Sequence, residues 1–440
     1  MNKIYFIGIG GIGVSALAKY YLSQNYLVAG SDLCESKTTT ELKKRGVLIN
    51  IGPHKAEHLP EDVDLVIYSN AIQYDNPELQ KARQFCRVLS YPQALGEITV
   101  PYTTIAVSGT HGKSITAAMS AAILEEAGLD PTIIIGTKTK QFPEGNFKLG
   151  TSQYLIIEAD EFKEAFLNYW PTIIVLTNLE PDHLDYYQSF KKLKKSFRKY
   201  LDHLPRDGKI VFNRDDKDVC QLVKKFPQKD QRPFSFLQSE KETLKELLDN
   251  PGEYNLYNAL ASFSLGRALN IPKDIIISGL RRYRGVERRF EEHEIKFNGK
   301  NLTLIDDYGH HPTEVKETLK TVRQKYPDRK IHFIFQPHQY KQVYYFLEEF
   351  KKTFRLILED KIVDKFILTD IYQAPGQEEE NCLINSSKIA QKTIGPVKYL
   401  PYKDIYNYCR RAPNNSDVLV LMGAGNIYNI SRRIREKNLF

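Results

Sequence analysis

The chain has 440 residues, which is too many for one hydrophobic core, so we expect two to four domains. With 42% hydrophobic and 11% aromatic residues, it is neither a disordered nor a fibrous protein. The formal net charge of +8 is modest for this length and favours a solvated surface or anionic small substrates over nucleic-acid binding.

The cysteines and the N-terminal residues indicate the cellular compartment in which the protein is expected. Five cysteines are scattered without a C-x-x-C pair, which predicts reduced thiols and argues against a zinc site. The chain enters a predicted strand at Lys3–Ile7 without a signal peptide, and no apolar run is long enough to cross a bilayer. We therefore expect a cytoplasmic protein, a monomer or a weak dimer, that acts on small molecules without nucleic-acid or membrane partners.

A glycine-rich turn near the N-terminus predicts a first phosphate site. Residues 4–7 form a predicted strand, residues 8–13 match G-x-G-x-x-G, and residues 14–22 continue as a helix. Asp32 follows the next strand, where nucleotide-binding folds place an acidic residue near a ribose hydroxyl. The pattern alone does not specify NAD. The predicted substrate-binding residues are Gly10, Gly11, Ile12, Gly13, Asp32 and, after a strand over 65–68, Ser69 and Asn70.

A second phosphate site is predicted where an apolar strand over 103–107 leads through a tight turn into a helix. Glycines let backbone N–H groups approach a polyphosphate, and the helix start adds a partial positive charge. Lys113 adds a full charge, and the Ser114 hydroxyl can bind Mg²⁺. Val107 stands where a strict Walker A motif has its first glycine. The predicted ATP contacts are Ser108, Gly109, Thr110, His111, Gly112, Lys113 and Ser114.

Polar residues later in the chain predict the contacts with the metal ion and with the adenine base of the nucleotide. Glu158 ends a strand over 154–157, and a carboxylate in that place needs a cation or a donor. His183 follows the strand over 172–176, so we predict that Ser114, Glu158 and His183 hold Mg²⁺. Asn255 and Asn258 share one face of a predicted helix, either to bind adenine or as ordinary polar residues near a helix start.

The last third of the chain begins with an arginine-rich stretch. Arg288 and Arg289 suit phosphate oxygens, although runs of charge are usually solvated. Predicted strands over 302–305, 331–335, 366–368 and 418–421 each end in polar or glycine residues, which is typical of a doubly wound sheet. His310 and His338 follow two of these strands, either as catalytic groups or as ordinary polar side chains.

These features predict an α/β protein of three domains. Residues 1–98 would form a Rossmann-like domain, residues 99–283 a central P-loop-type ATPase domain, and residues 284–440 a second Rossmann-like domain. Residues 91–101 are predicted to be a linker because Pro92 and Pro101 punctuate them.

Taken together, the motifs resemble the Mur ligases of peptidoglycan synthesis over the whole chain, and most closely the branch that adds L-alanine to UDP-N-acetylmuramate. The resemblance rests on seven stretches in this order: Gly8-Ile9-Gly10-Gly11-Ile12-Gly13, Gly109-Thr110-His111-Gly112-Lys113-Ser114, Glu158-Ala159-Asp160-Glu161, Thr177-Asn178-Leu179-Glu180-Pro181-Asp182-His183, Gly285-Val286-Glu287-Arg288-Arg289-Phe290, Asp306-Asp307-Tyr308-Gly309-His310-His311-Pro312 and Met422-Gly423-Ala424-Gly425.

The resemblance implies an ATP- and Mg²⁺-dependent ligase of cell-wall synthesis. The first domain would bind UDP-N-acetylmuramate, the central domain ATP and Mg²⁺, and the third the amino acid. ATP would phosphorylate the lactyl carboxylate, and the amine would attack the acyl phosphate. In this scheme the catalytic residues are Lys113, His183, Arg288, Arg289, His310 and His338, and ATP is also contacted by Asn255, Asn258 and Asp306.

The chain departs from the family pattern at several positions. Gln342 stands where the family has an arginine for the amino-acid carboxylate, and the neighbouring Lys341 could substitute only as a point charge. Gly376 replaces a usual glutamate, Tyr254 a usual histidine, and Ser114 a threonine with the same hydroxyl. These departures leave the amino acid more open than the reaction class.

Three alternatives follow from the same residues. One is a murein-peptide recycling ligase, which attaches a ready-made tripeptide. Another is an NAD(P)-dependent oxidoreductase built on residues 8–13, which leaves Lys113, Glu158 and His183 without a role. The third is a nucleotide-binding regulator without turnover, which the loss of arginine at Gln342 favours.

Overall fold

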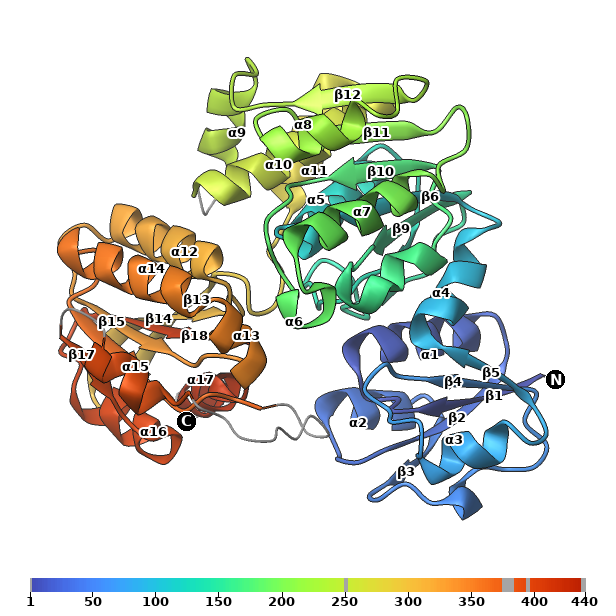
Figure 1. Ribbon diagram of the computed structural model, residues 1–440, viewed down its shortest axis with the longest axis horizontal. Helices are drawn as coiled ribbons and strands as arrows, with labels where there is room; N and C mark the ends of the chain where they lie inside the picture. Colours follow the sequence, from blue (N-terminus) through green and yellow to red (C-terminus); the bar gives the residue numbers. More distant parts are fainter. Residues whose placement is uncertain (1, 249–251, 374–383, 393–395, 437–440) are drawn as a thin grey trace. The chain divides into compact units, whose positions relative to one another are not determined.

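Three separate sheets organise the computed structural model, which describes residues 2–248, 252–373, 384–392 and 396–436 (Figure 1). The chain divides into two compact units. The first unit comprises residues 1–182, 189–247 and 257–286, and the second comprises residues 183–188, 248–256 and 287–440. The first unit contains two of the sheets and the second unit contains the third. The predicted α/β class is therefore confirmed.

The first sheet is parallel throughout, with strand order β3-β2-β1-β4-β5. Its central strand is apolar and buried from Ile4 to Ile7, as expected for a strand covered on both faces. The strands are β1 (Lys3–Ile7), β2 (Leu27–Asp32), β3 (Leu48–Ile51), β4 (Leu65–Tyr68) and β5 (Arg87–Ser90), and the helices are α1 (Ile12–Ser23), α2 (Lys37–Lys43), η1 (Ala56–His58) and α3 (Pro77–Ala82).

The predicted linker over 91–101 is instead mostly helical. Helix α4 (Tyr91–Thr99) begins with a capping box in which Ser90 and Gln93 satisfy each other's backbone groups. Pro92 lies in its first turn, where proline is tolerated because the missing N–H would have no helical partner. Proline was thus misread as a breaker at a place where it starts a helix.

The second sheet is built around the buried strand β6, in the order β12-β11-β10-β6-β9-β7-β8. Its neighbours are parallel except the β7–β8 pair at the edge. The strands are β6 (Thr103–Ser108), β7 (Thr132–Ile134), β8 (Phe147–Lys148), β9 (Tyr154–Glu158), β10 (Ile173–Leu176), β11 (Lys209–Asn213) and β12 (Asp230–Phe234). The helices of this region are α5 (Lys113–Glu126), η2 (Phe162–Asn168), α7 (Phe190–Leu201), α8 (Lys217–Val223), α9 (Lys241–Leu247), α10 (Glu253–Ala268) and α11 (Lys273–Arg282).

The loop between β7 and β8, residues 135–146, joins the two sheets of the first unit. Lys19 of α1 is only 2% exposed, and its ammonium donates to the Glu144 carbonyl and to Asn146 Oδ1, each at 2.7 Å. Asn146 Nδ2 donates in turn to the carbonyl of Ile12 at 2.6 Å. The same loop reaches residue 285, because Thr139 Oγ1 donates to the Gly285 carbonyl at 2.9 Å.

The third sheet has the order β13-β14-β18-β15-β16-β17, with an antiparallel edge strand β13 on an otherwise parallel sheet. Helices α12 and α14 pack on one face, and α16 and α17 pack on the other (Figure 1). The strands are β13 (Glu291–Phe297), β14 (Lys300–Asp307), β15 (Ile331–Phe335), β16 (Lys365–Leu368), β17 (Val397–Tyr399) and β18 (Val418–Met422). The second unit's helices are α6 (Leu184–Tyr187), α12 (Pro312–Lys325), α13 (Tyr340–Tyr345), α14 (Leu347–Glu359), α15 (Ser386–Lys392), α16 (Tyr402–Arg411) and α17 (Ile427–Glu436). Among all these described helices, none is long and apolar enough to span a membrane.

Candidate active site

The turn after β6 is fixed by the end of the neighbouring strand β10. Thr177 Oγ1 donates to the His111 carbonyl at 2.7 Å, and Asn178 Oδ1 accepts the His111 N–H at 2.8 Å. Gly109 and Gly112 have φ values of 130° and 82°, and a Cβ on Gly109 would lie 2.1 Å from Thr177 Oγ1. The glycines are therefore required by packing as well as by backbone conformation. The sequence did not reveal that Thr177 and Asn178 hold the loop.

Lys113 begins α5 and is anchored over the turn by three acceptors. Its Nζ lies 2.8 Å from the Gly109 carbonyl, 3.2 Å from the Thr110 carbonyl and 2.7 Å from Oε2 of the fully buried Glu161. Burial alone would lower the pKa of Lys113. The negative charges of Glu161 and Asp160 outweigh that effect, so the pKa lies above its ordinary value and the amine stays protonated. Glu161 is thus the partner of Lys113, a role that the sequence reading had not assigned.

Ser114 and Glu158 come together beside this turn. Ser114 Oγ donates to Glu158 Oε2 at 2.9 Å, and the Gly136 N–H donates to Oε1 at 2.9 Å. A hydroxyl and a carboxylate are the hard oxygen ligands that Mg²⁺ prefers, so their chemistry fits the predicted metal. His183, the third predicted ligand, belongs to the second unit and precedes α6 in a left-handed conformation with φ 49°. Its pairing with Glu158 stays a prediction.

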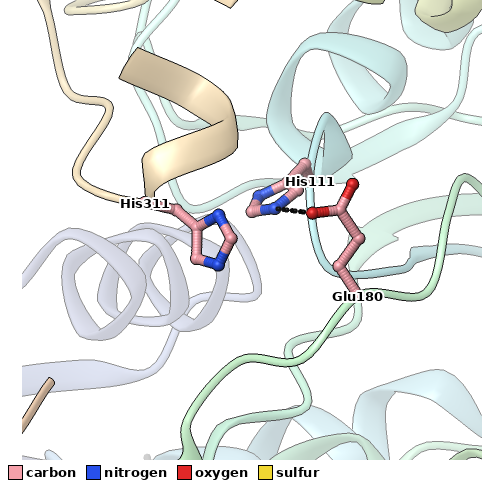
Figure 2. Close-up of side chains that lie close together, drawn as sticks. All are labelled: His111, Glu180 and His311. Carbon is pink, nitrogen blue, oxygen red and sulfur yellow. Dashed lines mark ion pairs between the residues drawn. The ribbon is translucent and has the colours of Figure 1, made fainter. Parts of the chain in front are cut away.

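His111 points from the turn toward the segment that follows β10. Its Nε2 lies 3.7 Å from Glu180 Oε2, and Figure 2 shows this ion pair. Thr110 Oγ1 also accepts the Glu180 N–H at 2.9 Å. Two successive residues of the turn are therefore held by the Glu180 segment.

Asn258 of α10 lies against the same turn. Its Oδ1 accepts from Thr116 Oγ1 at 3.2 Å and would lie 2.2 Å from a Cβ on Gly112. Its Nδ2 is buried and has no hydrogen-bond partner among the described residues. A buried amide donor without a partner fits the predicted contact with a nucleotide. Asn255, the other predicted adenine contact, belongs to the second unit, so the joint role of the pair stays a prediction.

The N-terminal glycine turn is braced by Asp32. The Gly10 N–H donates to Asp32 Oδ2 at 2.8 Å, and Gly11 is the N-cap of α1. The first-turn N–H groups of α1 are therefore available to an anion, as predicted for a phosphate site. Ser69 follows β4 and is bonded through its N–H to the Ile7 carbonyl at 3.0 Å. The exposed Asn70 lies next to it, and the ligand contacts of Asp32, Ser69 and Asn70 stay predictions.

In the second unit, the two predicted arginines are held by contacts of their own. The Arg288 guanidinium donates to the Gly423 carbonyl at 2.6 Å and lies between the rings of Tyr308 and Tyr428, at 4.8 and 4.7 Å. Arg289 pairs with Glu314 at 3.1 Å. Asp306 is 1% exposed, with Oδ1 3.7 Å from Arg288 Nε, and burial raises its pKa to about 6. The predicted ATP contacts of these three residues stay predictions.

The structure brings His310 and His338 together, with ring centroids 5.6 Å apart. Burial, followed by the charge of His310, lowers the pKa of His338 to about 3, so its imidazole is neutral. Gln342 is buried in α13 and hydrogen-bonds His338, whereas Lys341 on the same helix is exposed. Gly376 lies outside the described residues.

Three family models cover most of this chain. They are the Mur ligase family catalytic domain over residues 3–103, the Mur ligase middle domain over 107–245 and the Mur ligase glutamate ligase domain over 288–425. The chain belongs to the Mur ligase family.

Relatives and solved structures agree with this membership. UDP-N-acetylmuramate–L-alanine ligases of Aquifex aeolicus and Clostridium tetani are 37% and 36% identical over 97% of this chain and 96% of theirs. The UDP-N-acetylmuramate–alanine ligase of Thermotoga maritima matches with a TM-score of 0.79 and 26% identity over 99% of each chain. A murein peptide ligase of Psychrobacter arcticus shares the fold, with a TM-score of 0.72 and 22% identity over 99% of this chain and 98% of that one. Family membership excludes the oxidoreductase alternative.

Proposed function

We propose that this Mur ligase uses ATP and Mg²⁺ to join L-alanine to the carboxylate of UDP-N-acetylmuramate, in the cytoplasm and as a monomer or weak dimer. The relatives that share more than a third of their residues over nearly the whole chain carry this activity in their names. The observation in the molecule itself that carries the proposal is the turn at 109–114. There Lys113 meets Glu161 at 2.7 Å and Ser114 meets Glu158 at 2.9 Å.

In this proposal the phosphoryl transfer depends mainly on residues of the first unit, with His183 of the second unit as a further metal ligand. Lys113 and the backbone N–H groups at the start of α5 would bind the ATP phosphates and stabilise charge on the transferring group. Ser114 and Glu158, with His183, would hold Mg²⁺, which neutralises phosphate charge when it is bound. Asn258 would donate to the nucleotide through its buried Nδ2. The N-terminus of α1 would bind the diphosphate of the acid substrate.

The second unit supplies the groups for the bond-forming half of the reaction. The phosphorylated carboxylate is attacked by the amine, and phosphate leaves from the tetrahedral intermediate. Arg288 and Arg289 would neutralise charge on the phosphates, and the neutral His338 would lie beside His310 near the reacting groups. A neutral imidazole can accept a hydrogen bond from the amine nucleophile. Because Gln342 is uncharged, Lys341 is the candidate for the amino-acid carboxylate.

The test follows phosphate release from ATP and Mg²⁺ with UDP-N-acetylmuramate and a panel of amino acids. Mixtures that lack one substrate serve as controls. We expect turnover only when both substrates are present, with L-alanine preferred. Turnover with a free tripeptide in place of alanine would instead identify a recycling ligase. ATP binding without turnover on any amino acid would identify a regulator.

A further inference from the structure

Tyr91 opens helix α4, which leads from the first sheet to the second. Its side chain lies on Gly13 of the glycine turn. A Cβ built on Gly13 would meet the tyrosine Cζ at 2.7 Å and its Oη at 2.8 Å. Gly13 lies in the first turn of α1, so the phenol hydroxyl is beside the helix N-terminus that is expected to bind an anion. Gly13 therefore makes room for this ring.

Charges of the ATP site also act on this hydroxyl. Burial raises the pKa of Tyr91 well above its ordinary range, and the charges of Glu158 and then Asp160 raise it further. The phenol is therefore protonated at any physiological pH and can donate a hydrogen bond. Glu158 is itself fixed by Ser114 and Gly136, each at 2.9 Å. Tyr91 thus lies within the field of the groups predicted to hold the metal.

The Tyr91 side chain is half-buried. A protonated hydroxyl beside a helix N-terminus is suited to an anionic oxygen. The capping box of Ser90 and Gln93 fixes the backbone at this position, and the ring lies against Gly13.

We propose that the Tyr91 hydroxyl donates a hydrogen bond to an anionic oxygen of the acid substrate, beside Gly13 of the glycine turn. This inference rests on the proposed function, because it takes UDP-N-acetylmuramate as the acid. The substrate offers two anionic groups, its diphosphate and its lactyl carboxylate, and both share the chemistry that a phenol donor recognises.

The experiment compares wild type with Tyr91→Phe, which keeps the ring on Gly13 and removes only the hydroxyl. We expect kcat/KM for UDP-N-acetylmuramate to fall by about tenfold or more, as for loss of a hydrogen bond to a charged group, with KM for ATP unchanged. The matched control is Tyr200→Phe, because the buried Tyr200 hydroxyl has no hydrogen-bond partner within the described part of the chain and its ring stacks on Phe166. This control should match wild type in both parameters.

Calorimetric titration then separates the two anionic groups. Weaker binding of both UDP and UDP-N-acetylmuramate to Tyr91→Phe places the donor on the diphosphate. Weaker binding of UDP-N-acetylmuramate alone places it on the carboxylate. A variant that binds and turns over UDP-N-acetylmuramate within twofold of an active wild type overturns the inference. A wild type that binds ATP but never uses this acid overturns the proposed function instead.

Discussion

At the scale of single residues, the structure assigns partners that motifs do not reveal. Lys113 was predicted as a phosphate ligand, but its ammonium is also held by the buried Glu161 and by two carbonyls of its own turn. Gln342 was noted as a missing arginine, and the structure adds that its amide is buried against His338. Lys113 and Gln342 are therefore each held by other groups of the protein itself.

Replacing Lys113 by alanine should reduce phosphate release by roughly a thousandfold, because the charge that stabilises the transferring phosphoryl group is lost. The substitution also leaves Glu161 buried without its cation, so a double variant with Glu161→Gln should recover folding but not turnover. Lys225→Ala, at an exposed position, is the control and should be as active as wild type. An active, well-folded Lys113→Ala would contradict the assignment.

Asp306 should make stability depend on pH. Its pKa is raised from 3.8 to about 6 by burial, so the folded state favours the protonated form. This contribution is present below pH 4 and is lost as pH rises through 6. The free energy of unfolding of Asp306→Asn, relative to that of wild type, should therefore be greater at pH 8 than at pH 4 by about 2 to 3 kcal/mol, at 1.36 kcal/mol per pKa unit. Denaturant unfolding at both pH values measures this gain.

The exposed Asp328 provides the control for that comparison. Asp328→Asn should change stability equally at pH 4 and pH 8. The same result for Asp306→Asn would show that its carboxyl is ordinary in the folded protein.

At the scale of elements, apolar runs were enough to predict strands β6, β9, β10 and β14, and the two glycine turns predicted the helices that follow them. Short edge strands such as β8 and β17 carry too few residues to show a pattern. Helix α4 was missed because Pro92 was read without its capping box. The contacts of Thr177 and Asn178 with the turn at 109–114 join segments far apart in sequence, which periodicity cannot reveal.

The loop 135–146 should couple the two sheets of the first unit. Lys19→Met and Asn146→Ala each break the buried hydrogen bond of 2.7 Å, and a hydrogen bond to a charged group contributes about 1.5 to 3 kcal/mol. In a double-mutant cycle we expect a coupling energy of about 1 to 2 kcal/mol, measured by urea unfolding. Arg45→Ala removes a more exposed ion pair with Glu144 and should cost much less. Strict additivity of the Lys19 and Asn146 substitutions would refute the coupling.

At the scale of the whole molecule, the first unit carries both glycine turns, and the second carries the arginines and histidines that were predicted to be catalytic. The domain boundaries predicted from sequence stay predictions, whereas the division into α/β sheets is confirmed. Three sheets with separate cores predict that unfolding is not a single two-state transition.

The single tryptophan allows the first unit to be followed alone. Trp170 belongs to that unit and is 52% exposed, stacked on His203. ADP with Mg²⁺ at a hundred times its dissociation constant should stabilise the tryptophan-reported transition by about 2.7 kcal/mol. Circular dichroism detects the helices of both units, so the stabilisation by nucleotide that it reports should be smaller. A nucleotide effect confined to the circular dichroism signal would place the ATP site outside the first unit.

The buried amine of Lys19 has a chemical consequence. Burial lowers its pKa to about 8, so near that pH about half of these amines would be uncharged and nucleophilic, yet the loop 135–146 shields them. An acylating reagent should therefore modify Lys19 slowly while the two sheets stay together and rapidly once the loop releases α1. The rate of Lys19 acylation, followed by peptide mapping, would therefore measure how often the loop 135–146 separates from α1.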